Sequence, residues 1–442
     1  MIRFLSFKSC AFSRRAADLA VQRLRFQATL AVDHTIQACV SALARLGIRL
    51  PSPLMSRLLS HGITARLMPS SLGLAAQGRR VILVTGTNGK TTTTALVVAA
   101  LGGVVATNPG NHNFFCGLLD TLLSSTAEIV VLEVDELWLP KVLRWLTPEL
   151  LLILNLFEDA WLRTPSPVFV MDSWRSSLDA SRTTILAWAD DSSLVALFAN
   201  QPVQWVTQLE AALSEAQPVL CPACHGILKR QGQHWFCRCT IQHPASLDSP
   251  ASIWTLSADG LRLDSPLGST VPSLTIEPGL MGRINHLNAA FAAAAAVLAG
   301  EEPVVVEQRL RRFDRLPLRD SVYRLAGREV RLLVAKNPAA WMVLSDRFYG
   351  HHGLILLQQQ SAATIDLSWL YDLPVECLRG HCVGVCGNHA LDLAVWLTYS
   401  QVDFITAADP RVLVQRMPPG ELLCISDLLG AYYIQSLAEG GV

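Results

Sequence analysis

The sequence predicts an α/β protein built on a parallel sheet, followed by a second and smaller α/β unit. The first observation is an apolar strand at 81–84 that runs into a glycine-containing turn and then a helical stretch from about 91 to 101. The second is two further apolar strands, at 129–133 and 151–154. Continuous apolar runs are typical of strands buried on both faces, and their alternation with helices indicates parallel pairing.

The third observation is a new series of strands late in the chain. Apolar runs at 330–334 and 354–357 follow a predicted hinge near Glu301–Pro303, and an alanine-rich helix after Asn285 precedes it. We therefore divide the chain into a helical N-terminal region (1–70), a central α/β domain that carries the glycine-containing turn (71–302) and a C-terminal α/β domain (303–442). The central domain carries a cysteine-bearing insertion at 217–245.

Composition excludes several classes of protein. Of 442 residues, 51% are hydrophobic and 16% charged, which favours a chain with a large core over a disordered one. The formal charge is zero, so no broad positive field is present to recruit nucleic acid, and we expect no nucleic-acid partner. No run of 18 uninterrupted apolar residues occurs, so we expect no membrane-spanning helix.

Residues 1–32 are strongly basic. They contain six Arg and Lys residues against the single acid Asp18, with apolar residues between them. We interpret this segment as an amphipathic helix that packs on the next domain or makes a peripheral contact with a membrane surface. An organelle transit peptide is the alternative, because such peptides are also basic and amphipathic.

The turn at 86–92 has the composition of a phosphate-binding loop. Its glycines allow close approach of the backbone to phosphate, and the helix N-terminus attracts negative charge. Lys90 would neutralise the β- and γ-phosphate oxygens, and the Thr91 hydroxyl would bind Mg²⁺. Val84 stands where the general Walker pattern has Gly, so the strict pattern fails; a plain glycine turn with a surface Lys is the alternative. The expected nucleotide contacts are Gly86, Thr87, Asn88, Gly89, Lys90, Thr91 and Thr92.

An acidic segment follows the strand at 129–133. Glu133 ends that strand, and a carboxylate at the carboxyl end of a parallel strand lies at the edge where phosphate loops lie. We therefore expect Glu133 to be a catalytic Mg²⁺ ligand beside Thr91. Asp135 and Glu136 are either further functional carboxylates or solvated loop charges.

Four cysteines form a zinc-ribbon pattern in the insertion. Cys221 and Cys224 make a CxxC turn, and Cys237 and Cys239 follow as a CxC turn. Two such turns can supply the four thiolates of a structural Zn²⁺ site. The shorter second turn leaves open that His243 or His234 replaces one thiolate.

The loop GTNGKTT after an apolar strand resembles that of the Mur ligase and folylpolyglutamate synthase superfamily. Other segments occur in the order expected of MurT-like Mur ligases, and the similarity spans about residues 75 to 400. These segments are Asn108–Asn111 with Gly117, Glu133–Glu136, Asn155–Asp159, Ala189–Asp191, Gly282–Ala289, Phe313–Arg315 and Lys336–Ala339.

The resemblance implies ATP, Mg²⁺ and Zn²⁺ as cofactors, and an amidation reaction. In the family, the α-carboxylate of D-glutamate in the lipid II stem peptide attacks the γ-phosphate of ATP. Ammonia from a class I glutaminase subunit then displaces phosphate from the acyl phosphate. The implied partners are that glutaminase, in a heterodimer, and lipid II. The implied location is the cytoplasm, with possible contact at the inner face of the cell membrane.

The resemblance also assigns four further residues. Asn285 and Asn288 would lie near the nucleotide, although an Asn that caps the following helix is compatible with the same pattern. Asp366 and Asp372 would complete the catalytic machinery of the glutaminase, with loop or cap carboxylates as the alternative.

This chain departs from the family pattern at several positions, which puts its substrate and its glutaminase contact in question more than its ATP binding. After the Asn-Leu-Phe segment it reads Asp159-Ala-Trp-Leu-Arg163, where the family has Asp-Gln-Leu-Asp-Arg. The acidic run before Asp366 is replaced by 358–365, and Trp396 stands in place of a basic residue. Two alternatives follow: a Mur-type ligase that adds an amino acid without a glutaminase, and a nucleotide-binding scaffold that has lost its chemistry.

Overall fold

The fold is taken from a computed structural model of the chain. Two compact units can be distinguished: one comprises the described residues up to Thr85 with Gly103–Leu151 and Ser177–Thr184, and the other comprises Gly86–Gly102, Leu152–Ser176 and the chain from Ile185 on. The structure describes residues 68–108, 112–157, 166–208, 220–231, 234–239, 241–244, 252–277, 279, 283–313, 316, 320–335, 337–345, 353–358 and 375–438.

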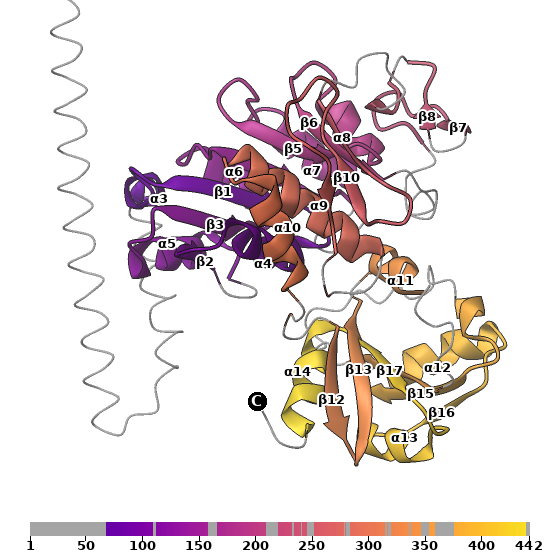
Figure 1. The fold of residues 1–442 in the computed structure, drawn as a ribbon. Helices are drawn as coiled ribbons and strands as arrows, with labels where there is room; N and C mark the ends of the chain where they lie inside the picture. Colours follow the sequence, from indigo (N-terminus) through magenta and orange to yellow (C-terminus); the bar gives the residue numbers. More distant parts are fainter. Residues whose placement is uncertain are drawn as a thin grey trace, which may run out of the picture. The chain divides into compact units, whose positions relative to one another are not determined.

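A nine-stranded sheet carries the first α/β arrangement, with strand order β11-β10-β9-β6-β5-β4-β1-β3-β2 (Figure 1). The pairs β1–β3, β2–β3, β5–β6 and β6–β9 are parallel, whereas β10 is antiparallel to both of its neighbours. Its strands are β1 (Arg80–Thr85), β2 (Val105–Thr107), β3 (Ile129–Glu133), β4 (Leu150–Ile153), β5 (Thr184–Trp188), β6 (Gln204–Gln208), β9 (Ile253–Leu256), β10 (Arg262–Asp264) and β11 (Leu274–Thr275).

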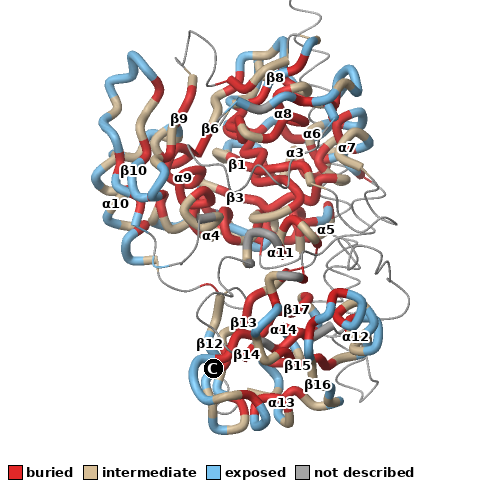
Figure 2. The backbone as a smooth tube through the Cα atoms, turned by 90° about the vertical axis from the view of Figure 1, so that its right-hand side faces the viewer, coloured by how far each residue is buried: buried red, intermediate tan, exposed pale blue. Residues whose placement is uncertain are grey.

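The strands β1 and β3 are buried because both of their faces are apolar. Only the first residue of each is not fully buried, as expected for strands covered on both faces. Figure 2 shows this buried centre and the exposed surface of helix α10. The pairing sets Val84 opposite Glu133, so both strands end at the same edge of the sheet. The loop after β1 and the carboxylate of Glu133 therefore start from neighbouring strand ends.

Helix α4 (Lys90–Leu101) follows that loop, and it packs against α9 (Arg283–Leu298) and α10 (Pro303–Arg311). Residues 289–296 of α9 are seven alanines and one phenylalanine, all buried, and such small side chains let two helices approach closely. Arg309 of α10 donates to the carbonyls of Ala100 and Leu101, at the end of α4. A cation at a helix C-terminus is favourable with the helix dipole, so this bond helps fix the helix that carries Lys90.

Five shorter helices and one hairpin complete this part of the chain. Helix α8 is capped by Asp191, whose side chain accepts from the N–H groups of Ser193 and Leu194. The hairpin belongs to the cysteine-bearing insertion. The elements are α3 (Ser71–Ala75), α5 (Phe115–Ser124), α6 (Leu139–Leu143), α7 (Pro167–Trp174), α8 (Ser192–Leu197), and the antiparallel strands β7 (Lys229–Gln231) and β8 (His234–Phe236).

The C-terminal part has a six-stranded sheet of its own, with order β12-β13-β17-β14-β15-β16. All neighbours are parallel except β12 and β13. Its elements are β12 (Ser321–Leu325), β13 (Arg328–Val334), α11 (Pro338–Ser345), β14 (Gly353–Gln358), the 3₁₀ helix Val375–Leu378, β15 (Cys382–Gly387), α12 (Ala390–Tyr399), β16 (Phe404–Thr406), α13 (Pro410–Arg416), β17 (Leu422–Ser426) and α14 (Leu428–Leu437).

This sheet is buried on both faces. Leu423 and Ile425 of β17 belong to one apolar cluster, which includes side chains of α11 and α12. The alternate residues Leu422 and Cys424 belong to a second cluster with α13 and α14. Since successive side chains of a strand point to opposite faces, two helical layers cover the sheet.

The strands and helices expected in the part of the chain that the structure describes are confirmed to within two residues. The predicted strand at 129–133 has identical bounds, and the predicted helix from 91 begins at Lys90. The α/β fold class is confirmed as well, while the antiparallel edge formed by β10 and β11 was not expected. The boundaries at residues 70 and 302 stay predictions, and the basic segment 1–32 lies outside the described residues. No helix in the described ranges is long and apolar enough to cross a membrane.

A prediction for the C-terminal part concerns Arg328. Its guanidinium donates to four backbone carbonyls, those of Val414, Met417, Pro418 and Gly420, at 2.6–3.0 Å. Replacing Arg328 by Met leaves these acceptors without their shared donor and should lower the free energy of unfolding by about 2–4 kcal/mol. Chemical denaturation measures this. Arg324→Met, on the exposed side of β12, is the control and should change stability by less than about 0.5 kcal/mol.

Candidate functional site

The phosphate loop requires glycine at two positions. Gly86 (φ +134°) and Gly89 (φ +85°) have left-handed backbone conformations that disfavour other residues. A Cβ on Gly86 would lie 3.0 Å from the backbone N and O of Asn155, and a Cβ on Gly89 would lie 2.7 Å from Oδ1 of Asn288. The loop therefore packs closely against Asn155 and Asn288, and a side chain at either glycine would clash with these neighbours.

Lys90 is the first residue of α4 and is buried. Its Nζ donates to the carbonyl oxygens of Gly86 and Thr87, so the cation curls back over its own loop. Helix α4 has no acidic residue in its first turn, and the peptide dipoles at its N-terminus add their positive potential to that of Lys90. The arrangement fits a polyphosphate, and it excludes the alternative of a surface Lys in a plain turn.

Helix α9 brings Asn288 to the loop. Asn288 is buried, and its Oδ1 lies where a side chain on Gly89 would be. Asn285 is half-buried one turn earlier on the same helix. The structure thus places Asn288 next to the phosphate loop.

Glu133 is held by two asparagines. Asn108 pairs with its backbone: the N–H of Glu133 donates to Oδ1 of Asn108 at 2.8 Å, and Nδ2 of Asn108 donates to the carbonyl of Glu133 at 2.9 Å. Nδ2 of Asn113 donates to Oε1 of the carboxylate at 3.1 Å. A buried carboxylate with one oxygen fixed by an amide is well suited to bind a divalent cation. Sequence reasoning did not find Asn113, because only the fold brings it near Glu133.

Asp135 and Glu136 are not solvated loop charges, so that alternative is wrong. Their exposed fractions are 1% and 0%. The N–H of Asp135 donates to the carbonyl of Asn113, and its Oδ1 accepts from the N–H of Leu137. These bonds fix the turn between β3 and α6. Asp135 therefore stabilises the chain that directly follows Glu133.

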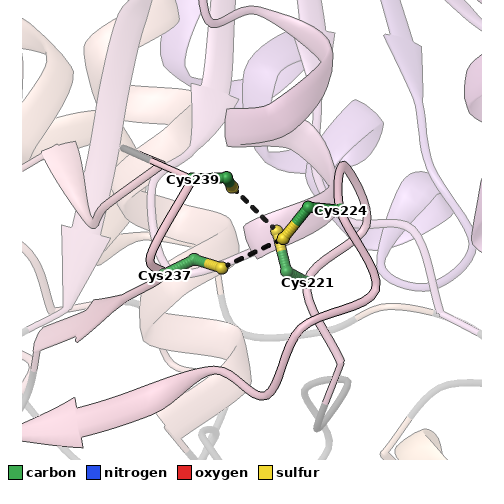
Figure 3. A group of neighbouring side chains, drawn as sticks. All are labelled: Cys221, Cys224, Cys237 and Cys239. Carbon is green, nitrogen blue, oxygen red and sulfur yellow. Dashed lines mark hydrogen bonds between the residues drawn. The ribbon is translucent and has the colours of Figure 1, made fainter.

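The four cysteines of the insertion come together (Figure 3). Sγ of Cys221 lies 3.5 Å from Sγ of Cys239, and Sγ of Cys224 lies 3.3 Å from Sγ of Cys237. All four sulfurs lie within 4.8 Å of one another. Zn–S bonds of about 2.3 Å in a tetrahedron place sulfurs about 3.8 Å apart, so the cluster fits one Zn²⁺.

The thiols of the pair Cys224 and Cys237 differ in pKa. A hydrogen bond from the backbone N–H of Cys239 lowers the pKa of Cys237 to about 7. A backbone hydrogen bond from Gly226 lowers the pKa of Cys224, but contacts with the sulfurs of Cys237 and Cys239 outweigh it and raise this pKa to about 12.

His243 and His234 take part in a different contact. Nε2 of His243 lies 3.0 Å from Oδ1 of Asp190, and Nδ1 of His243 lies 3.2 Å from Nδ1 of His234. Asp190 also accepts from the hydroxyl of Thr207 and the N–H of Gln208. These bonds fasten the ribbon to the sheet, so the geometry favours Cys239 over either histidine as fourth ligand.

Asp191 is a fully buried carboxylate next to Asp190. One oxygen accepts from the N–H of Leu156 at 2.7 Å, and the other caps α8 through Ser193 and Leu194. Burial raises the pKa of Asp191 to about 6, while these three backbone donors oppose that rise. Sequence reasoning noted Asp191 only as part of a family segment.

Several residues named from the sequence lie outside the described part of the chain. They are Asn111, Asp159, Arg163, Gly282, Lys336, Asp366 and Asp372.

Comparisons with known proteins give the class. The pseudomurein peptide ligase type C of Methanothermus fervidus has a TM-score of 0.62 at 18% identity, over 81% of this chain and 78% of that one. The MurF ligase of Thermotoga maritima, solved in complex with ADP, has a TM-score of 0.57 at 18% identity, over 86% and 82%. The chain therefore has the Mur ligase fold. No family model matches it.

A curated relative narrows the comparison. The chain is 26% identical over 339 residues to the MurT subunit of lipid II isoglutaminyl synthase (glutamine-hydrolyzing) from Streptococcus pneumoniae (strain ATCC BAA-255 / R6). The aligned region covers 68% of this chain and 72% of that relative. The resemblance to MurT-like Mur ligases expected from the sequence is confirmed, and the proteins it resembles are ligases.

The cysteine cluster yields a prediction about metal content. Protein purified without chelator should hold one zinc per chain by elemental analysis, and Cys239→Ser should lose most of it, because three thiolates leave the tetrahedral site incomplete. His243→Ala should keep its zinc. Cys382→Ser, at a half-buried cysteine of β15, is the matched control. Zinc that survives in Cys239→Ser but is lost in His243→Ala would contradict this ligand set.

Asp191 yields a prediction about pH. A folded pKa of about 6 lies above the ordinary 3.8, so the stabilising contribution of this group is complete below about pH 4 and is lost as pH rises through 6. Asp191→Asn lacks this titration. Its free energy of unfolding relative to the parent should therefore rise by about 1 kcal/mol between pH 5 and pH 7. Urea denaturation at both pH values measures the difference, and a constant difference would refute the assignment.

Proposed function

We propose that this chain is the ATP-dependent carbon–nitrogen ligase subunit of a lipid II isoglutaminyl synthase. It activates the α-carboxylate of D-glutamate in the stem peptide of lipid II, for amidation to D-isoglutamine. The ammonia comes from a class I glutaminase with which the chain forms a heterodimer. The observation that carries the proposal is the phosphate loop, in which glycines, a helix N-terminus and the buried Lys90 gather positive potential in one turn.

The residues that would hold the nucleotide are those of the loop and α9. Gly86, Thr87, Asn88, Gly89, Lys90, Thr91 and Thr92 form the turn that would receive the phosphates, and Asn285 and Asn288 approach this turn from α9. Mg²⁺ would be held by Thr91 and Glu133, and Zn²⁺ by Cys221, Cys224, Cys237 and Cys239. Bound Mg²⁺ neutralises charge on the triphosphate, while Zn²⁺ has a structural role.

The reaction has two steps. The substrate carboxylate forms a bond to the γ-phosphorus as the bond to the β,γ-bridging oxygen breaks, which releases ADP. Ammonia then forms the C–N bond, phosphate leaves with the C–O electron pair, and the ammonia nitrogen gives up a proton. In the first step Lys90 stabilises the charge that moves onto the β-phosphate oxygens, and the loop keeps the phosphate chain in line with the attacking carboxylate.

The partner and the substrate rest on the relative, whose name describes a glutamine-hydrolyzing enzyme acting on lipid II, of which it is a subunit. Asp366 and Asp372 are proposed to complete the catalytic machinery of the glutaminase. The proposed location is the cytoplasm, with contact at the inner face of the membrane, where a lipid-linked substrate is available.

Two alternative functions, an amino-acid ligase and a nucleotide-binding scaffold, differ from the proposed one in the product formed and the partner required. A Mur-type ligase that adds an amino acid would turn over ATP with an amino acid and would need no glutaminase. A scaffold would bind nucleotide without turnover. Copurification with a coexpressed class I glutaminase, and formation of an amide from lipid II, ATP and glutamine, would support the amidotransferase over both.

Lys90→Ala is the test of the catalytic assignment. Loss of the cation removes the main counter-charge at the β- and γ-phosphates, and ATP turnover with lipid II and the glutaminase should fall by about 10²–10³-fold. Lys141→Ala is the control, because Lys141 is exposed on α6 over the ring of Trp138, and it should retain parental turnover. Equal turnover in the parent and Lys90→Ala would refute the role of Lys90.

A further inference from the structure

Residues 155–157, which follow β4, hold the first half of the phosphate loop through hydrogen bonds to Thr87 and Asn88. We call this segment the clasp. Asn155 is buried, and it makes three hydrogen bonds to two loop residues. Its carbonyl accepts from the N–H of Thr87 at 2.9 Å. Its side-chain Oδ1 accepts from the N–H of Asn88 at 2.9 Å, and its Nδ2 donates to the carbonyl of Asn88 at 3.1 Å. The Asn155 amide therefore pairs with the loop as a neighbouring strand would.

A second pair of bonds reinforces the clasp two residues later. The hydroxyl of Thr87 accepts from the N–H of Phe157 at 3.0 Å and donates to the carbonyl of Phe157 at 3.2 Å. Thr87 is thus bonded through its backbone to Asn155 and through its side chain to Phe157, while Asn88 is bonded to Asn155 through its backbone. Because their N–H groups are occupied by the clasp, an anion must be held farther along, at the N-terminus of α4.

Asp191 anchors the clasp through a hydrogen bond to its backbone. Its Oδ2 accepts from the N–H of Leu156, the residue between Asn155 and Phe157. Its Oδ1 is used at the start of α8, so the same carboxylate ties the clasp to a helix. A buried carboxylate is costly unless it is well hydrogen-bonded, and here three backbone donors meet it. An ordinary helix cap needs only one of its oxygens.

We infer that Asn155 is a positioning residue for the nucleotide, which holds the first half of the phosphate loop in its anion-binding conformation, with Asp191 as its anchor. The inference rests on the proposed nucleotide-binding function. A loop that is already fixed binds its ligand without an ordering cost. The asparagine amide is specific for this task, because a carboxylate cannot donate to the carbonyl of Asn88 and an apolar side chain can neither donate nor accept.

The experiment compares the full-length parent with Asn155→Ala and Asn155→Asp. Calorimetric titration with Mg²⁺-ATP gives the Kd and the binding-competent fraction for each protein. The Ala variant should bind about tenfold more weakly. The Asp variant should bind more weakly still, since it loses the donor and places a negative charge beside the phosphates. Asn200→Ala, at an exposed turn residue after α8, is the matched control and should bind like the parent.

The binding-competent fraction separates positioning from stability. A residue needed only for folding would lower that fraction and the melting temperature while leaving the Kd of the folded molecules unchanged. A positioning residue raises the Kd at an unchanged fraction. If the parent binds Mg²⁺-ATP and Asn155→Ala has the same Kd, the inference is overturned; if the parent itself takes up no nucleotide, the proposed function fails instead.

Hydrogen exchange in the parent gives a test that needs no variant. The amides of Thr87 and Asn88 should be protected before any nucleotide is added, since both are bonded to Asn155. Rapid exchange of these two amides in the nucleotide-free protein would overturn the inference even if the Asn155 variants failed to fold.

Discussion

The structure around the candidate site depends on one constraint, the immobilisation of a glycine-containing loop between β1 and α4. A free loop of this composition has many conformations, and fixing each residue costs about 1–2 kcal/mol. Here a Cβ on Gly86 would meet the backbone of Asn155, so the loop lies directly on the chain that follows β4. The Lys90 cation then bonds to carbonyls of the same loop. Both the packing against Asn155 and the hydrogen bonds of Lys90 therefore fix this one turn.

Two adjacent carboxylates connect this turn to the cysteine-bearing insertion. Asp191 bonds to Leu156 beneath the loop, and Asp190 bonds to His243 of the ribbon. The ribbon itself has a small core, in which Cys221 and Cys237 pack with Trp235 and with Val195 of α8. A module of this size needs a metal or a larger neighbour to stay folded, and the ribbon has both a thiolate cluster and an anchored face. This explains how the insertion can be accommodated in the α/β fold without destabilising it.

Local patterns made the loop, the α/β class and the cysteine cluster predictable from the sequence. Val81 to Val84 reads as a buried strand, and Gly86 to Lys90 follows it directly, so strand, loop and helix lie within one short stretch. The clasp by Asn155 and the support of Glu133 by Asn113 were not predictable, because each joins residues that only the sheet order brings together. The burial of Glu136 was missed for the same reason: an acidic residue after a strand reads as solvated unless the covering elements are known.

The most direct measurement is a crystal structure of the chain with Mg²⁺ and a non-hydrolysable ATP analogue. The account predicts the β- and γ-phosphates against the backbone of residues 89–91, with Nζ of Lys90 turned from the carbonyl of Gly86 toward the phosphate oxygens. It predicts the metal on the hydroxyl of Thr91, facing Glu133. A triphosphate bound elsewhere, with Lys90 still bonded to the carbonyls of Gly86 and Thr87, would contradict it.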